Sequence, residues 1–307
     1  MRRTIWLASY PKSGHTWFRI LVANLSAKES EPVDINNLPS SAAGAREPFE
    51  YLSLIDSGAL TDDEIDCLRP RVYEGLTRGA DDDGALAARP VRFMSVHDAY
   101  MLTPKGEPLF AAGAEGAILI VRDPRDVACS LAHYNRMNID DAIAFMNSRE
   151  RDVHSSSGQL LALFRQRPRG WSGLAESWLE QTDIPVHLVR YEDMKKDTVG
   201  SFRGALEFAR SAATEDDIQR AVSLSDFSRL RSQEEEKGFR ELPWPHLGGR
   251  RFFRRGAAGG WRDELNAEQV ARIESAHGPM MRRLGYDLTG TTLATGPAQQ
   301  RVLAHGR

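Results

Sequence analysis

Four short runs of almost uninterrupted apolar residues constrain the fold of this chain more than any other feature. They are RTIWLAS at residues 3–9, VRFMSV at 91–96, GAILIV at 116–121 and PVHLVRY at 185–191. A strand with one exposed face alternates apolar and polar residues, whereas a strand of a parallel sheet is covered on both faces and carries a continuous apolar run. The runs therefore predict the strands of a buried parallel sheet.

Helical patterns follow two of these runs directly. TWFRILVANLSA begins at residue 16, after the first run, and PRDVACSLAHYNRM begins at residue 124, after the third. A strand, a tight turn and a helix in succession are typical of βαβ units. We therefore predict an α/β fold, a single domain with a central parallel sheet flanked by helices.

The composition narrows the class of protein further. The 307 residues carry a net charge of −3 and are 41% hydrophobic, which indicates a globular chain with a large core and argues against a nucleic-acid coat. The two cysteines, Cys67 and Cys129, are too few for a disulfide framework or a zinc site. We interpret them as reduced thiols of a cytoplasmic protein.

The first residues, MRRTIWLASYP, imitate a secretory signal, but the apolar run stops at Tyr10 and no small-residue cleavage pattern follows. No stretch approaches the ~18 apolar residues of a membrane span. We expect a soluble protein that is not exported and has no membrane span.

The turn after the first predicted strand has the composition of an anion site. Its residues are Lys12, Ser13, Gly14, His15 and Thr16. Backbone N–H groups at a helix N-terminus are unpaired and attract anions, and here Gly14 permits close approach while Lys12 adds a full charge. A Walker A loop places its Lys after a second Gly, so this turn is P-loop-like without being a P-loop. The alternative is an ordinary capped helix start, but Trp17 directly after the turn offers a face for a base to stack on.

Two further segments also have residues suited to binding a phosphate. Arg122 ends the third predicted strand, at the edge where open α/β sheets bind ligands, and an Arg can hold a phosphate through two parallel hydrogen bonds. The alternative for Arg122 is a surface ion pair with Asp126, worth under ~1 kcal/mol. The other segment is RRFFRRGAAGGW at 250–261, a Gly-rich loop with four Arg, for which a disordered basic loop or a nucleic-acid contact is the alternative.

Together these segments resemble the PAPS-dependent sulfotransferase family, which transfers a sulfuryl group from 3′-phosphoadenosine 5′-phosphosulfate (PAPS) to a hydroxyl or an amine. The matches are YPKSGTTW at residues 10–17 with His15 in place of a Thr, RNPKDVAVS at 122–130, YEDM at 191–194 and RKGxxGxW at 254–261. Their order and spacing agree with the family over residues 4–288.

The resemblance implies a role for each matched residue by its position. The residues that would hold the 5′-phosphosulfate are Lys12, Ser13, Gly14, His15 through its backbone, and Thr16. The residues that would hold the 3′-phosphate are Arg122, Ser130, Arg254, Arg255 and Gly256. The residues that would enclose or adjoin the adenine are Trp17, Tyr191, Ser225 and Phe227. PAPS is then the co-substrate, and no metal is implied.

The catalytic pair implied by the resemblance is Lys12, which would stabilise the leaving oxygen, and His97, which would act as the general base. The family has KTH after a strand, and the corresponding residues here end in His97, with Ser95 in place of the Lys. A structural histidine is the alternative for His97. His15 and Asp98 are rival bases, because His15 lies in the turn itself and Asp98 follows His97.

The resemblance also implies a sulfotransferase domain over residues 1–288 and a flexible tail over 289–307. Residues 30–90 and 135–172 would form the acceptor pocket and its lid, and residues 232–260 would close over the nucleotide. From composition, we predict that 30–90 is part helix and part loop, that 135–170, with its polar stretches RERDVHSSSG and RQRPRG, is a surface loop, and that 232–260 has too much Gly and Pro for a regular element.

The predicted acceptor is a partly apolar small molecule with a hydroxyl or an amine. This rests on side chains in and around the pocket segments, which are Phe49, Tyr51, Leu52, Tyr100, Met101, Tyr134, Met137, Phe145 and Met146, although core packing is an equal use for such residues. The segment from Arg169 to Met194 resembles bacterial sulfotransferases of natural products. A nucleotide-dependent kinase and a non-catalytic adenosine-bisphosphate or RNA-binding protein are the alternative functions. The oligomeric state stays open, with a homodimer as one option.

Overall fold

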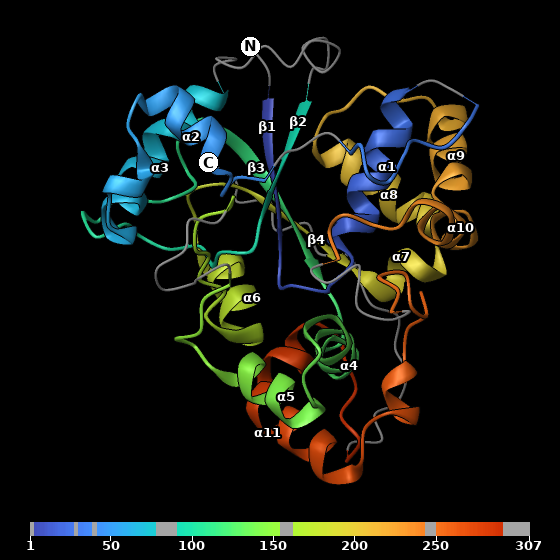
Figure 1. Cartoon of the computed structure of the whole chain (residues 1–307). Helices are drawn as coiled ribbons and strands as arrows, with labels where there is room; N and C mark the ends of the chain where they lie inside the picture. The colour runs from blue at the N-terminus through green and yellow to red at the C-terminus, as the bar shows by residue number, and fades with distance from the viewer. Residues whose placement is uncertain are drawn as a thin grey trace.

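A four-stranded parallel sheet lies at the centre of the molecule (Figure 1). The computed structural model describes residues 3–27, 30–38, 42–77, 91–153, 162–242 and 250–290. The strands are β1 (Arg3–Ser9), β2 (Val91–Val96), β3 (Ala114–Val121) and β4 (Val186–Arg190), in the spatial order β2-β1-β3-β4. All three pairings are parallel, so the predicted α/β sheet is confirmed.

Neighbouring residues of the central strands enter two different cores. On β1, Ile5 and Leu7 belong to one cluster of buried side chains, whereas Trp6 and Ala8 belong to another. Because successive side chains of a strand point to opposite faces, the sheet must be covered on both sides. This explains why the strand sequences are continuously apolar.

Helices cover both faces of the sheet (Figure 1). One face packs against α1 (His15–Ala27), α8 (Thr198–Phe208) and α9 (Glu215–Leu224). The larger core on the other face includes side chains of α2 (Arg46–Ser53), α3 (Asp62–Thr77), α4 (Pro124–Asn135), α5 (Ile139–Asn147), α6 (Gly170–Glu180) and α11 (Ala267–Arg283). The remaining helices are α7 (Tyr191–Lys196), α10 (Phe227–Lys237) and the short 3₁₀ turns η1 (Ser57–Ala59) and η3 (Gly260–Asp263).

Two segments are more regular than their composition indicated. The predicted loop after residue 135 contains helix α5, which Asn138 caps by accepting a hydrogen bond from the Asp141 N–H, and which buries Ile143 and Met146. That helical spacing of apolar residues outweighs the polar content around it. Helix α10 likewise extends to Lys237, because the EEEK sequence favours helix and the Gly and Pro residues come only afterwards.

Parts of the predicted ends and loops lie outside the described residues. Within the predicted tail, Thr289 is held by hydrogen bonds from its N–H and hydroxyl to the Glu274 carboxylate, and residues 291–307 are not among those described. The mixed helix and loop content predicted for 30–90 is observed in its described portion. No helix of the described ranges is long and apolar enough to cross a membrane.

Candidate active site

The candidate residues gather where the four parallel strands end. The phosphate turn follows β1, His97 follows β2, Arg122 follows β3 and Tyr191 follows β4. The register aligns these ends, since Ala8 pairs with Val96 and Ser9 with Ile120. These four groups of residues, which are far apart in the chain, therefore meet at one edge of the sheet.

The turn after β1 has backbone geometry suited to a bound anion. Lys12 and Gly14 have φ angles of 70° and 102°, in the left-handed region, and α1 begins at the next residue. A Cβ on Gly14 would lie 2.5 Å from Cδ2 of Tyr191, so only Gly fits between the turn and that ring. The buried Ser13 hydroxyl has no hydrogen-bond partner among the described residues. An orphaned donor at a helix N-terminus fits the phosphosulfate that the sequence predicted here.

The Lys12 side chain is held by two aromatic rings. Its Nζ lies 3.9 Å from the ring centroid of Tyr134 and 3.8 Å from that of Phe252. Burial of the ammonium, aided by Arg122 and opposed by Glu241, lowers the Lys12 pKa to about 7. The two ring faces stabilise the ammonium, whereas burial disfavours its charged form. Lys12 therefore loses its proton at a lower pH than an exposed lysine does.

A carboxylate that the sequence reasoning missed lies against helix α1. Glu241 accepts from Arg19 at 2.6 Å and from the Thr16 hydroxyl at 3.4 Å, and its carbonyl accepts from the Tyr134 hydroxyl at 2.9 Å. The pairing joins residues 222 positions apart, so no local pattern could reveal it. The Thr16 hydroxyl of the anion turn therefore already donates a hydrogen bond to an acidic side chain.

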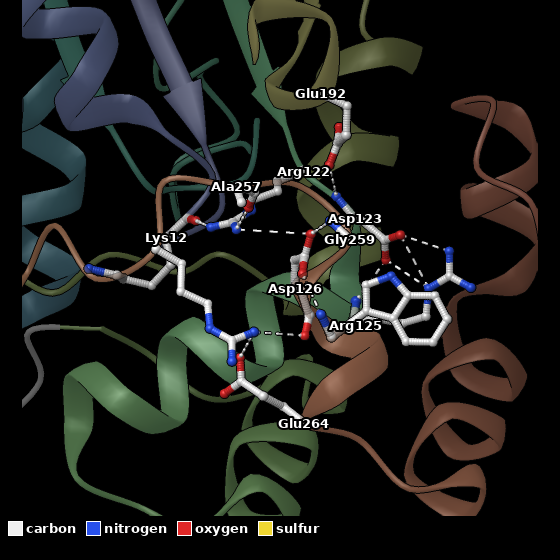
Figure 2. Close-up of polar contacts among 12 residues, drawn as sticks. Lys12, Arg122, Asp123, Arg125, Asp126, Glu192, Ala257, Gly259 and Glu264 are labelled. Carbon is white, nitrogen blue, oxygen red and sulfur yellow. Dashed lines mark hydrogen bonds and ion pairs between the residues drawn. The ribbon is translucent and has the colours of Figure 1, made fainter. Parts of the chain in front are cut away.

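Arg122 links the turn to the late Gly-rich loop. Figure 2 shows its guanidinium between the carbonyls of Lys12 and Ala257, to which it donates at 3.3 and 3.1 Å. The guanidinium also lies 4.4 Å from the ring centroid of Tyr191, while the Asp126 carboxylate is 3.9 Å away. The alternative of a simple Arg122–Asp126 pair therefore describes only the longest of these polar contacts.

Asp123 and Asp126, the acidic residues of the 122–130 motif, accept hydrogen bonds that hold the surrounding elements in place (Figure 2). Asp126 accepts from the backbone N–H groups of Gly259 and Trp261, at 2.7 and 2.9 Å. Asp123 caps α4 by accepting from the Arg125 N–H, and the Arg125 side chain binds the same carboxylate. A kinase would need such an aspartate for Mg²⁺, whereas Asp123 is committed to a cap and an arginine.

The two predicted phosphate arginines of the late loop are paired with carboxylates. Arg254 binds Glu264 through two hydrogen bonds of 2.6 and 2.8 Å, and Arg255 lies 3.4 Å from Asp263. Gly256 has φ of 59°, and a Cβ there would lie 2.3 Å from the Phe227 ring. Ser130, the last residue of the motif, is half-buried on α4.

Aromatic side chains predicted to enclose adenine form one wall of the site. The Trp17 and Tyr191 rings meet edge to face with centroids 5.9 Å apart, and the Trp17 indole donates to the Ser225 carbonyl at 3.0 Å. Lys195, which the sequence reasoning missed, places its Nζ 5.2 Å from the Trp17 ring centroid and 5.9 Å from that of Phe227. The Ser225 hydroxyl is buried and accepts from the Asn24 amide at 2.9 Å.

Contacts with Ser9 and Gln166 orient His97. Its Nδ1 lies 2.7 Å from the Ser9 carbonyl, and its backbone N–H donates to the Gln166 amide oxygen at 2.6 Å. A carbonyl can only accept, so Nδ1 carries the proton and Nε2 carries the lone pair. This tautomer presents a basic nitrogen on the side of the ring away from β1.

The two rival bases differ from His97 in their surroundings. Asp98 is fully buried and accepts from the Arg69 guanidinium and, at 2.6 Å, from the Arg167 N–H. Burial, followed by the charges of His97 and Arg19, lowers the His15 pKa well below its usual value. Asp98 is thus engaged in a buried ion pair, and His15 is a poor proton acceptor.

Several apolar residues suggested for the acceptor pocket are core residues. Phe49, Tyr100 and Met146 are all buried in the larger core, whereas Tyr51 is 69% exposed. Tyr134 is the member of that group that reaches the anion turn, through Lys12. The described residues contain no group of three or more His, Cys, Asp or Glu side chains that could hold a metal ion.

The fold and the site have the make-up of an α/β protein that binds an anionic ligand at the ends of its strands. A sequence profile described as the sulfotransferase domain matches residues 2–285, and the chain therefore belongs to the PAPS-dependent sulfotransferase family. It is an enzyme of that class, and sulfuryl transfer from PAPS is its reaction.

Known proteins similar to this chain agree. Flavonol 4′-sulfotransferase of Flaveria chlorifolia is 24% identical over 281 residues, which cover 88% of this chain and 76% of the relative. Cytosolic sulfotransferase 12 of Arabidopsis thaliana is 25% identical over 275 residues, covering 88% and 74%. Retinol dehydratase, solved in complex with androsterone and the inactive cofactor PAP, superposes with a TM-score of 0.59 at 19% identity over 95% of this chain and 84% of that one.

Proposed function

We propose that the enzyme transfers the sulfuryl group of PAPS to a hydroxyl or amine of a small-molecule acceptor, with His97 as general base and Lys12 stabilising the leaving oxygen. The observation that carries this proposal is the His97 ring, whose Nδ1 donates to the Ser9 carbonyl and whose Nε2 is thereby left basic at the strand ends. PAPS supplies the sulfuryl group and the leaving phosphate.

The chain supplies positioning and charge. His97 Nε2 would take the proton of the acceptor as its oxygen or nitrogen bonds to sulfur, a contribution of typically ~10²–10⁴ in rate. The Lys12 ammonium would move from the Tyr134 and Phe252 rings toward the anion and neutralise the charge that builds on the leaving oxygen.

The nucleotide would lie along the residues of the edge. Ser13, Gly14 and Thr16 would meet the 5′-phosphosulfate, and Arg122 the 3′-phosphate. The other candidates for the 3′-phosphate are Ser130, Arg254, Arg255 and Gly256, and those for the base are Trp17, Tyr191, Phe227 and Ser225. The PAP bound in the retinol dehydratase structure supports PAPS as the co-substrate.

Relatives support a small-molecule acceptor, since their names include flavonol, luciferin and amine sulfotransferases. Another relative is named cytosolic sulfotransferase 12 of Arabidopsis thaliana, and its name supports a cytoplasmic location. We propose one catalytic domain over residues 1–288, in which the segments 30–90 and 135–172 contribute to acceptor binding.

Calorimetric titration with adenosine 3′,5′-bisphosphate (PAP) tests the nucleotide site. Loss of the Arg122 guanidinium removes charge-assisted hydrogen bonds, so Arg122→Ala should weaken binding ~10- to 100-fold. Arg71→Ala is the matched control, because its side chain is 72% exposed on α3. Equal affinity in wild type and Arg122→Ala contradicts the assignment.

Transfer assays with PAPS and a panel of phenols, alcohols and amines test the reaction. Lys12→Ala and His97→Ala should each lose at least ~10²-fold in turnover while still folding. A protein that binds PAP and transfers to none of the panel would instead be a non-catalytic nucleotide-binding protein. Near wild-type turnover in both variants would refute the two roles.

A further inference from the structure

The role assigned to His15 in the anion turn uses only its backbone. Its imidazole ring is left without a function. Its ring packs edge to face against the ring of His97, with centroids 5.2 Å apart and an interplanar angle of 68°. Its Nε2 is buried and has no hydrogen-bond partner among the described residues. A buried ring nitrogen without a partner is unfavourable, so a hydrogen-bonding ligand at this position would be stabilising.

The two histidines are not equivalent. His97 has its Nδ1 proton fixed by the Ser9 carbonyl, which leaves its Nε2 basic. His15 stays neutral, because burial and the charges of His97 and Arg19 hold its pKa far below neutrality. Two further charged groups belong to these surroundings. Lys12 lies in the same turn as His15, and Glu241 accepts a hydrogen bond from the neighbouring Thr16. A neutral imidazole keeps one N–H and can donate a hydrogen bond without giving up its proton.

The position of His15 lies between the two halves of the reaction. Its backbone belongs to the turn that would hold the 5′-phosphosulfate, and its ring touches the residue that would take the acceptor proton. In an in-line transfer the sulfuryl group passes between the leaving phosphate and the acceptor. A sulfuryl group transferred between these two positions would therefore pass close to the His15 ring.

We propose that His15 is a further catalytic residue, which donates a hydrogen bond from Nε2–H to an oxygen of the sulfuryl group during transfer. This rests on the proposed function. The acceptor O–H bond breaks and its proton goes to His97, the acceptor oxygen bonds to sulfur, and the sulfur–oxygen bond to the 5′-phosphate breaks with its electron pair left on that phosphate, facing Lys12. His15 keeps its proton throughout.

A pair of substitutions separates donation from packing. His15→Leu fills similar space without a donor, and His15→Gln places an amide N–H near the position of the imidazole Nε2–H. Transfer from PAPS to 4-nitrophenol, and in parallel to water, is followed under single-turnover conditions. We expect His15→Leu to lose ~10²–10³ in rate and His15→Gln to stay within about tenfold of wild type, since removal of one preorganised donor has that effect. PAP affinity should change less than about threefold in both, because the backbone contacts of the turn remain.

The pH dependence distinguishes His15 from a base. The acid limb of the rate profile, set by His97, should persist in both His15 variants and disappear in His97→Ala. Equal rates for His15→Leu and wild type, or equal losses for His15→Leu and His15→Gln, would overturn the role of His15 while leaving the proposed function intact. A wild type that does not bind PAP, or that transfers to none of the phenols, alcohols and amines of the panel, would refute the proposed function itself.

Discussion

Binding of the nucleotide should be accompanied by uptake of a proton at Lys12. With a pKa of about 7 between the Tyr134 and Phe252 rings, Lys12 is ~90% deprotonated at pH 8 in the nucleotide-free protein. A phosphate beside the ammonium favours its charged form and returns the pKa toward the usual value of about 10.4. Binding at pH 8 should therefore take up about 0.9 proton per molecule.

Calorimetric titration with PAP in phosphate, HEPES and Tris buffers at pH 8 measures this number. The observed enthalpy, plotted against the ionisation enthalpy of the buffer, has the proton number as its slope. Lys12→Arg is the matched control, because arginine stays protonated at this pH and keeps the charge for the ligand. Its slope should be near zero.

At pH 6 wild-type Lys12 is already protonated, so the difference between wild type and Lys12→Arg should shrink to about 0.1 proton. Ionisation of PAP itself is common to both proteins and cancels in that difference. A slope near zero for wild type at pH 8, or the same slope in Lys12→Arg, would refute the coupling of the Lys12 proton to the ligand.

Three further perturbations follow from the geometry. Gly14→Ala should lower both PAP affinity and the thermal midpoint, since the turn has φ of 102° and the new Cβ would meet Tyr191 at 2.5 Å; calorimetry and thermal denaturation measure the two effects. Asp98→Asn should cost about 3 kcal/mol in urea unfolding, because it leaves buried Arg69 short of one negative partner. Glu241→Gln should tighten PAP binding by ~2- to 5-fold, the worth of a partly exposed ion pair of up to about 1 kcal/mol.

Each of these has a matched control. Gly106→Ala adds a Cβ at φ of 80° with no atom within 4 Å, so it isolates the backbone cost from the clash. Asp63→Asn changes a carboxylate that is 67% exposed and should cost under ~1 kcal/mol. Glu235→Gln removes a carboxylate of α10 that pairs with Arg231 and Arg251 and should leave PAP affinity unchanged. Equal effects in a variant and its control would contradict the corresponding explanation.

The strands and the outline of the site could be predicted because both depend on patterns of residues that are close together in the sequence. Continuous apolar runs indicated a sheet covered on both faces, and Lys12, His97 and Arg122 each closely follow a strand, so a parallel sheet had to bring them to one edge. Helix α5 was missed because polar residues around it concealed the spacing of Ile143 and Met146.

The contacts inside the site could not be predicted from spacing. Glu241 reaches Arg19 across 222 positions, and Phe252 reaches Lys12 from a loop whose Gly and Pro content indicated only the absence of a regular element. The same limit applies to Phe49, whose aromatic character fits a pocket and a core equally well and which the structure buries. Long-range pairing depends on tertiary packing, which no local pattern encodes.

The carboxylate of Glu241 also bears on how the product leaves. This carboxylate binds Arg19 and the Thr16 hydroxyl, so it would compete with a phosphate of the nucleotide for these donors, and the departure of PAP would be an exchange of one anion for another. The counterion that replaces the phosphate would then be one that the protein carries itself. The affinity for PAP should accordingly depend less steeply on ionic strength than the number of basic residues around the site would indicate.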